Sequence, residues 1–286
     1  MYYDSMKQLI RLAGRQKKCI GDIVLAVEAE QEDESPSTIR GQMVISWEVM
    51  KLALERGITE DIRSVSGLSG GDAKLLFSRE PKFLSSEVSN AVARALGVAE
   101  VNASMGRIVA CPTAGSCGIV PAALLLAKEK LELDEAAIIK ALFTAAGIGI
   151  VCSLNASISG AEGGCQAECG VAAAMAAGAL TELAGGSPTM VGHAVALTLS
   201  NMLGLVCDPV AGLVEVPCVL RNAGALMQAL LGAELALAGI KSRIPVDEVI
   251  GAMREVGEDL PESLRETSLG GLANTPTGVR LRRKLA

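Results

Sequence analysis

Eight cysteines are the most reactive side chains of this 286-residue sequence, which contains a single histidine. Five of them fall in loops that also carry glycine, serine, threonine or proline. The loops of this kind cover residues 64–72, 111–118, 157–165 and 207–218. Loops of such composition at helix ends are where small-molecule chemistry usually lies. The spacing of the cysteines therefore bears directly on what chemistry the chain performs.

The cysteine spacing excludes the common zinc sites. No Cys-x-x-Cys pair is present, and one histidine cannot complete a site of the Cys/His type. The run of cysteines typical of ferredoxins is also absent. A dispersed set of thiols beside proline and glycine is compatible with an iron–sulfur cluster whose ligands come from separate loops. The alternative for each thiol is burial in the core, because free cysteine packs as a small apolar residue.

Composition excludes other classes of function. Residues 1–18 lack the basic and then apolar pattern of a secretory signal, so we expect a cytoplasmic protein in which structural disulfides do not form. Aromatic residues make up 2% of the chain, and the net charge is −6. Few rings and excess negative charge are poorly suited to nucleic acid, so we expect no nucleic-acid partner.

Two stretches with little charge, residues 141–161 and 183–207, each reach the roughly 20 residues that span a bilayer. Both are interrupted by polar residues, glycine or proline, and neither has the expected aromatic and basic flanks. We therefore expect buried helices in a soluble core and no membrane contact, with a membrane helical bundle as a weaker alternative.

Helical patterns dominate the elements that must position the loops. Ser35 and Pro36 supply an N-cap and a first residue for a helix that ends at Gly57. Ser85 or its neighbour caps a helix that ends at Gly97. Further helices are predicted from Asp134 onwards and at residues 171–183, 188–203, 219–239 and 246–256.

Alternating strand patterns are scarce, so the predicted fold is all-α. We expect a compact single-domain helical bundle over residues 1–286, with buried central helices rich in alanine and glycine. The basic residues 280–286 are predicted to form a surface tail. In such a bundle, small side chains let the helix backbones approach closely.

Long motifs in the loops resemble the bacterial iron–sulfur-dependent L-serine dehydratases. They include Cys-Asp-Pro-Val-Ala-Gly-Leu-Val-Glu-Val-Pro-Cys at 207–218 and Ser-Gly-Ala-Glu-Gly-Gly-Cys-Gln at 159–166. Segments 69–73, 111–119 and 266–278 are similar to the same family. The length resembles the separate alpha subunit of the two-chain enzymes rather than the fused single-chain form.

The resemblance implies a lyase that dehydrates L-serine to pyruvate and ammonia. It also implies a 4Fe–4S cluster held by three cysteines, which fall on Cys165, Cys207 and Cys218. Three ligands on four irons leave one iron open to act as a Lewis acid for the serine hydroxyl. The resemblance further implies a beta subunit as partner in a hetero-oligomer.

Two loops are predicted to contact the substrate. Ser69, Gly70 and Gly71 resemble an anion-binding turn that would hold the substrate carboxylate, although an ordinary helix N-cap fits the same residues. Thr113 and Ser116 are expected to contact substrate from the loop at 111–118.

The other five cysteines are predicted to have supporting or packing roles. Cys111 and Cys117 flank the second loop, and we expect their thiols to support it. Cys169 lies four residues after Cys165, but a fourth thiolate would close the open iron, so we expect packing there. Cys19 and Cys152 are predicted to lie in apolar helices of the core.

The sequence does not identify the base that would remove the substrate's Cα proton. His193 lies in an apolar helix outside the quoted motifs, which favours a structural role. We therefore infer that the base comes from the beta subunit. The competing hypothesis is a pyridoxal-phosphate amino-acid lyase, which needs a lysine such as Lys74 and normally an α/β scaffold.

Overall fold

The computed structural model describes residues 2–285, which form helices and loops without a β-sheet. An isolated bridge joins Cys207 to Arg265. The α-helices are α1 (Met6–Gln16), α2 (Ile20–Gln31), α3 (Pro36–Thr59), α4 (Asp72–Phe77), α5 (Ser86–Ala103), α6 (Ile119–Lys130), α7 (Glu135–Asn155), α8 (Gly160–Gly163), α9 (Val171–Leu183), α10 (Pro188–Met202), α11 (Cys218–Leu237), α12 (Val246–Asp259) and α13 (Pro276–Leu285). Short turns of other helix types are η1 (Ala114–Ser116), η2 (Gln166–Gly170), η3 (Val210–Gly212), η4 (Glu262–Leu264) and η5 (Gly271–Asn274). The prediction of an all-α fold is confirmed.

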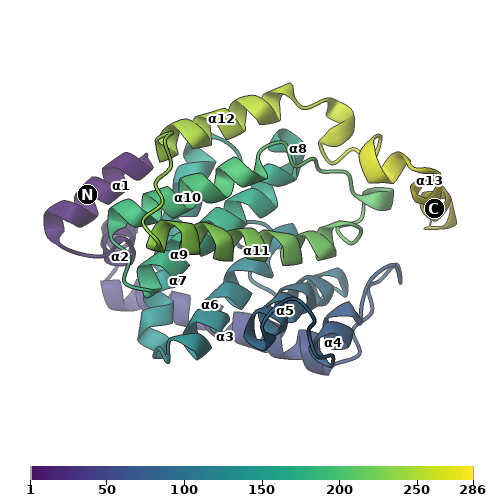
Figure 1. Cartoon of the computed structure of the whole chain (residues 1–286), viewed down its shortest axis with the longest axis horizontal. Coiled ribbons are helices and arrows are strands. Elements are labelled where there is room, and N and C mark those ends of the chain that lie inside the picture. Colours follow the sequence, from purple (N-terminus) through teal and green to yellow (C-terminus); the bar gives the residue numbers. More distant parts are fainter. Residues whose placement is uncertain (1, 286) are drawn as a thin grey trace.

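Helix α9 lies at the centre of the molecule. Residues 171–181 of this helix are all buried, and α9 packs against α6, α7, α10 and α11. Figure 1 shows α9, α10 and α11 between α12 on one side and α3, α4 and α5 on the other. Six of the 13 residues of this helix are alanine, and a Cβ added to Gly178 would overlap the side chain of Ile148. Its small side chains therefore allow its neighbours to pack closely around it.

Helix starts follow the capping signals in the sequence. A side-chain oxygen at each of four N-caps accepts a hydrogen bond from the amide three residues later; these N-caps are Ser35, Ser85, Asp134 and Ser187. Helix α9 has its predicted bounds, and α10, α11 and α12 begin and end within three residues of theirs. Local hydrogen bonds from capping side chains therefore fix the starts of α3, α5, α7 and α10.

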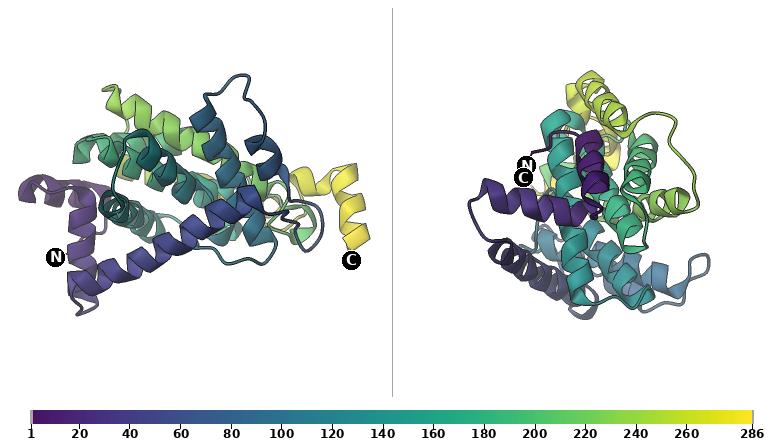
Figure 2. Two further views of the ribbon diagram at one scale, coloured as in Figure 1. Left: turned by 90° about the horizontal axis from the view of Figure 1, so that it is seen from below. Right: turned by 90° about the vertical axis from the view of Figure 1, so that its left-hand side faces the viewer.

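Two predicted helix ends were wrong. Helix α3 continues past Gly57 to Thr59, and α5 continues past Gly97 to Ala103. The two glycines face each other where the helices cross, and a Cβ on Gly97 would lie 2.8 Å from the Cα of Gly57. Figure 2 shows α3 as a long helix running across one side of the molecule. Glycine at these positions permits close backbone approach instead of ending a helix.

Helix α7 is long and apolar enough to cross a membrane, judged by length and composition among residues 2–285. Its apolar window is 67% buried inside the molecule, where it packs against α2 and α9. Burial of this kind is typical of a core helix, as predicted for residues 141–161. The other weakly charged stretch, 183–207, contains the shorter α10 and its flanking loops.

The C-terminal residues form a helix on the surface. The segment predicted as a surface tail lies in α13 as far as residue 285, and residue 286 is outside the described range. Arg280, Arg282, Arg283 and Lys284 are exposed on this helix. Figure 1 shows α13 at the end of the molecule opposite α1.

Replacing Gly57 by alanine should destabilise the fold through the crossing of α3 and α5. The new methyl group would overlap the backbone of Gly97, and overpacking of this kind costs about 1–3 kcal/mol. Gly41→Ala in the same helix is the matched control, because nothing lies within 4 Å of its added Cβ and alanine favours helix. Thermal unfolding should show a lower Tm for Gly57→Ala only; equal Tm values for both variants would contradict the proposed crossing.

Candidate functional site

The three cysteines predicted as cluster ligands lie in one buried region. Cys165 precedes η2, Cys207 lies in an extended segment after α10, and Cys218 is the first residue of α11. All three are free thiols with exposed fractions of 2%, 2% and 7%. They are close enough that the charges of Cys165 and Cys218 contribute to raising the pKa of Cys207, after the larger effect of burial.

A π-helical turn positions Cys165. Turn η2 leads directly into α9, and the side chain of Gln166 fixes it to two other segments. That side chain accepts a hydrogen bond from the amide of Gly204 and donates one to the carbonyl oxygen of Met253. Such turns redirect side chains and are frequent at functional sites. Here the turn places Cys169 so that its thiol hydrogen-bonds to Cys165.

The thiols of this region differ in acidity. The hydrogen bond from Cys169, with a smaller contribution from the Arg221 guanidinium, lowers the pKa of Cys165 below its usual value. Burial raises the pKa of Cys218 to about 12 and also raises that of Cys207. Thiolates are the species that bind metal, so metal binding would displace these protons.

A buried ion pair holds the two ends of the loop at 207–218 together. The carboxylate of Asp208 lies 2.7 Å from Nη2 of Arg221 on α11. Nη1 of the same arginine donates to the carbonyl oxygen of Val206 at 2.7 Å. Because Asp208 follows Cys207 and Arg221 lies one turn after Cys218, the pair fixes both cysteines relative to each other.

The C-terminal segment before α13 closes over the same loop. Cys207 exchanges backbone hydrogen bonds with Leu264 and Glu266. The second carboxylate oxygen of Asp208 accepts from the amide of Leu272 at 2.7 Å. A Cβ on Gly271, whose φ is +56°, would lie 2.7 Å from the Cβ of Asp208. Much of the motif at 266–278 therefore clamps the loop that carries Cys207.

Glu168 is the residue of this region that the sequence analysis missed. Its carboxylate oxygen Oε2 lies 4.0 Å from Sγ of Cys207, and Thr113 hydrogen-bonds to the same carboxylate. Burial raises the pKa of Glu168 above its usual value, with a smaller contribution from the charge of Glu266. The signal available in the sequence was its position between Cys165 and Cys169.

The loop at 111–118 reaches this carboxylate through Thr113. The hydroxyls of Thr113 and Ser116 are 3.1 Å apart and form a capping box around η1. Asn222 on α11 fixes the loop, accepting from the amide of Gly118 and donating to the carbonyl oxygen of Gly115. Thr113 therefore lies beside the cysteine region, while the buried Ser116 supports its loop.

The turn at Ser69, Gly70 and Gly71 faces carboxylates of the chain itself. The hydroxyl of Ser69 donates to Glu215 of the loop at 207–218. The amides of Gly71, Asp72 and Ala73 donate to the buried carboxylate of Glu100, and burial raises the pKa of that group. A substrate carboxylate could use these amides only by displacing Glu100.

The other cysteines occupy three kinds of position. Cys111 and Cys117 are buried beneath their loop, and burial raises the pKa of Cys111 to about 12. Cys152 is buried in α7, as predicted. Cys19 is not: it is the half-buried N-cap of α2 and donates to Asp22 at 3.0 Å. The prediction that Cys19 lies inside an apolar helix was therefore wrong.

Among residues 2–285, no three His, Cys, Asp or Glu side chains converge as a site for one metal ion. The three buried thiols and the nearby Arg221 nevertheless suit an iron–sulfur cluster. Each thiolate of such a cluster binds a different iron, so the sulfurs need not meet at one point. Thiolates are also the ligands that iron–sulfur clusters take, and a buried guanidinium compensates negative charge.

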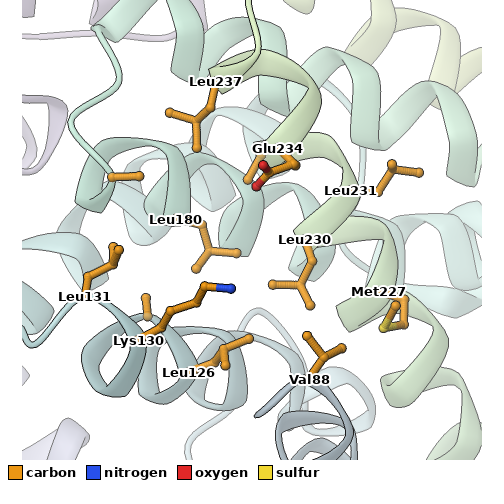
Figure 3. A pocket seen from close by; sticks show the side chains of 13 residues that line it. Val88, Leu126, Lys130, Leu131, Leu180, Met227, Leu230, Leu231, Glu234 and Leu237 are labelled. Atoms are coloured by element: carbon orange, nitrogen blue, oxygen red, sulfur yellow. The ribbon is translucent and has the colours of Figure 1, made fainter. Parts of the chain in front are cut away.

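Hollows also lie outside the cysteine region. One of about 410 Å³ is formed by α5, α6, α9 and α11, and Figure 3 shows leucines lining it together with Lys130 and Glu234. None of the predicted site residues lines it. Another, of about 350 Å³, lies beside α8 and is lined in part by Ser157 and Arg265.

Comparison with known proteins gives the family. A sequence profile described as serine dehydratase alpha chain matches residues 15–273. The chain belongs to the serine dehydratase alpha chain family. Serine dehydratases are lyases, so the chain is an enzyme component of that class.

Individual relatives align with nearly the whole chain. A Bacillus subtilis protein named as a probable L-serine dehydratase alpha chain is 50% identical, with 99% of this chain and 95% of the relative covered. The L-serine dehydratase alpha chain of Peptoniphilus asaccharolyticus is 42% identical, with 98% of this chain and 97% of the relative covered. An L-serine dehydratase of Streptomyces coelicolor is 39% identical, with 93% of this chain but 59% of the relative covered.

Replacing Gly271 by alanine should open the clamp around Cys207. The new methyl group would overlap Asp208, in addition to the roughly 1–2 kcal/mol that positive φ costs a non-glycine residue. Gly239→Ala is the matched control, because Gly239 has a φ of +88° with nothing within 4 Å of its added Cβ.

Site-resolved alkylation and thermal unfolding measure the two effects. Gly271→Ala should lower the Tm more than the control does and should raise the alkylation rate of Cys207 several-fold. Equal alkylation of Cys207 in both variants would show that the C-terminal segment does not protect this thiol.

Proposed function

We propose that the chain is the alpha subunit of an L-serine ammonia-lyase that converts L-serine to pyruvate and ammonia. The observation that carries this proposal is the meeting of three buried cysteine loops around Glu168, in a chain of the serine dehydratase family. Removal of the Cα proton and loss of the hydroxyl give aminoacrylate. Its imine form hydrolyses to pyruvate and ammonia.

We propose that Cys165, Cys207 and Cys218 hold a 4Fe–4S cluster. With three protein ligands, such a cluster has one iron free to supply Lewis-acid chemistry for departure of the serine hydroxyl. The chain's own residues supply the surroundings. Burial of the three thiols excludes water from them, and Arg221 places a positive charge beside them.

The substrate side of the site is assigned to the two loops that adjoin the thiols. Thr113 presents its hydroxyl next to Glu168, and Ser116 holds Thr113 in place. The turn of Ser69, Gly70 and Gly71 is tied to the cysteine loop through Glu215. We keep this turn as a candidate for the substrate carboxylate, with Glu100 as the internal anion that the substrate would replace.

A pyridoxal-phosphate mechanism has little support. Lys74, the lysine nearest a glycine-rich loop, lies on the short helix α4 with a side chain that is 43% exposed. Its ammonium forms an ion pair with Asp61 at 2.7 Å. An exposed, paired lysine is poorly placed to form a Schiff base, which needs a desolvated amine.

We propose that a beta subunit completes the enzyme and supplies the catalytic base in the cytoplasm. The names of the relatives as alpha chains and the greater length of the Streptomyces protein support a second component. His193 is a poor candidate for the base. It lies nine residues before Met202, at which α10 ends near the cysteine region, a distance of about 14 Å along a helix.

Serine substitution should separate the three ligands from the other thiols. Cys165→Ser, Cys207→Ser and Cys218→Ser should each retain less than about a tenth of the normal iron and sulfide after anaerobic reconstitution, because thiolate is the ligand. Cys19→Ser and Cys169→Ser should retain both. Iron analysis and absorbance near ~400 nm measure the outcome; normal iron content in any of the three variants would remove that cysteine from the proposed set.

The second subunit is tested by reconstitution. The purified chain with its cluster should turn over L-serine slowly, and adding a purified beta subunit should raise kcat by about 100-fold or more, the usual contribution of a general base. Full turnover by the chain alone would show that the base lies within these 286 residues.

A further inference from the structure

The carboxylate of Glu168 lies in the middle of the cysteine region, where the charge of Arg221 acts on it but no ion pair with it forms among residues 2–285. Its recorded contacts are the hydroxyl of Thr113 and, at 4.0 Å, Sγ of Cys207. Unlike its neighbours in η2, whose side chains are buried, Glu168 is partly exposed. A carboxylate in such a place retains capacity to accept further hydrogen bonds.

Two glycines let neighbouring loops pack against this carboxylate. A Cβ added to Gly160 would lie 2.7 Å from Oε2 of Glu168 and 2.9 Å from Sγ of Cys207. A Cβ added to Gly115 would lie 3.6 Å from Oε1. The two glycines come from the loops at 157–165 and 111–118. A side chain at position 160 would overlap both Glu168 and Cys207, so a ligand reaches this carboxylate at the part of its surface that stays exposed.

We propose that Glu168 binds the α-ammonium group of the amino-acid substrate. An ammonium group carries three donors and a positive charge, which match an unpaired, partly buried carboxylate. Charge-assisted hydrogen bonds of this kind gain strength in a site with little water. The assignment rests on the proposed function, and it places the ammonium-bearing end of the substrate beside Glu168 and Thr113.

Binding of two small probes tests the assignment without turnover. L-Alanine carries the ammonium and carboxylate of L-serine but has no hydroxyl to lose, and propionate also lacks the ammonium. Calorimetry on the anaerobically reconstituted enzyme should show L-alanine binding at least about tenfold more tightly than propionate, as expected for one charge-assisted contact. Glu168→Gln, which preserves shape, should reduce this preference to about threefold or less, with normal iron content.

The control is Glu266→Gln. It removes a negative charge that acts on Glu168, from an exposed side chain, and it should leave the preference for L-alanine unchanged. An unchanged preference in Glu168→Gln would overturn the assignment. So would a loss of iron in that variant, which would make Glu168 a cluster ligand. If the unaltered enzyme bound neither L-serine nor L-alanine, the proposed function itself would fail, and the role of Glu168 with it.

Discussion

The buried ion pair between Asp208 and Arg221 is the interaction on which the cysteine region most depends. It joins the segment that carries Cys207 to the helix that begins with Cys218, and its side chains are 3% and 15% exposed. Removing one partner of such a pair leaves an uncompensated buried charge and costs about 3–5 kcal/mol. The pair stays satisfied because Asp208 also accepts from Leu272 and Arg221 also donates to Val206. The same ion pair therefore fixes the shape of the loop at 207–218 and balances the charges of its own two side chains.

The helical scaffold supplies the rigidity that these loops lack. Helix α9 starts immediately after η2 and packs among four other helices. This packing fixes the direction in which the side chains of Cys165 and Glu168 project. Helix α11 carries Cys218, Arg221 and Asn222 within its first five residues, so a single element positions one thiol, one cation and the loop at 111–118. Side chains on packed helices are held more tightly than side chains on loops, which suits a site that must bind a preformed group.

The helices were predictable from the sequence because their determinants are local. A capping side chain accepts a hydrogen bond from the amide only three residues later, and a run of small residues indicates the buried central helix. The helix ends predicted at Gly57 and Gly97 were wrong because glycine is favoured both where a helix ends and where two helix backbones approach closely. The sequence alone does not distinguish these two cases. The three thiols were selected as candidate ligands because of the motif resemblance. Glu168 was not selected, because its position beside them depends on the π-helical turn. A regular helical period does not reveal that turn, since Gln166 maintains it through Gly204 and Met253.

The acidic residues around the site differ in the groups that bind them. Asp208 has a partner on each oxygen, Glu215 accepts from Ser66 and Ser69, and Glu100 accepts from backbone amides. These carboxylates hold segments together, although Oε2 of the buried Glu100 has no hydrogen-bond partner. Glu168 has a hydroxyl and a thiol as neighbours and remains partly open to solvent. Glu168 forms no ion pair among residues 2–285 and keeps acceptor capacity beside Cys207 that the fold does not use. A cationic group of the substrate would satisfy it.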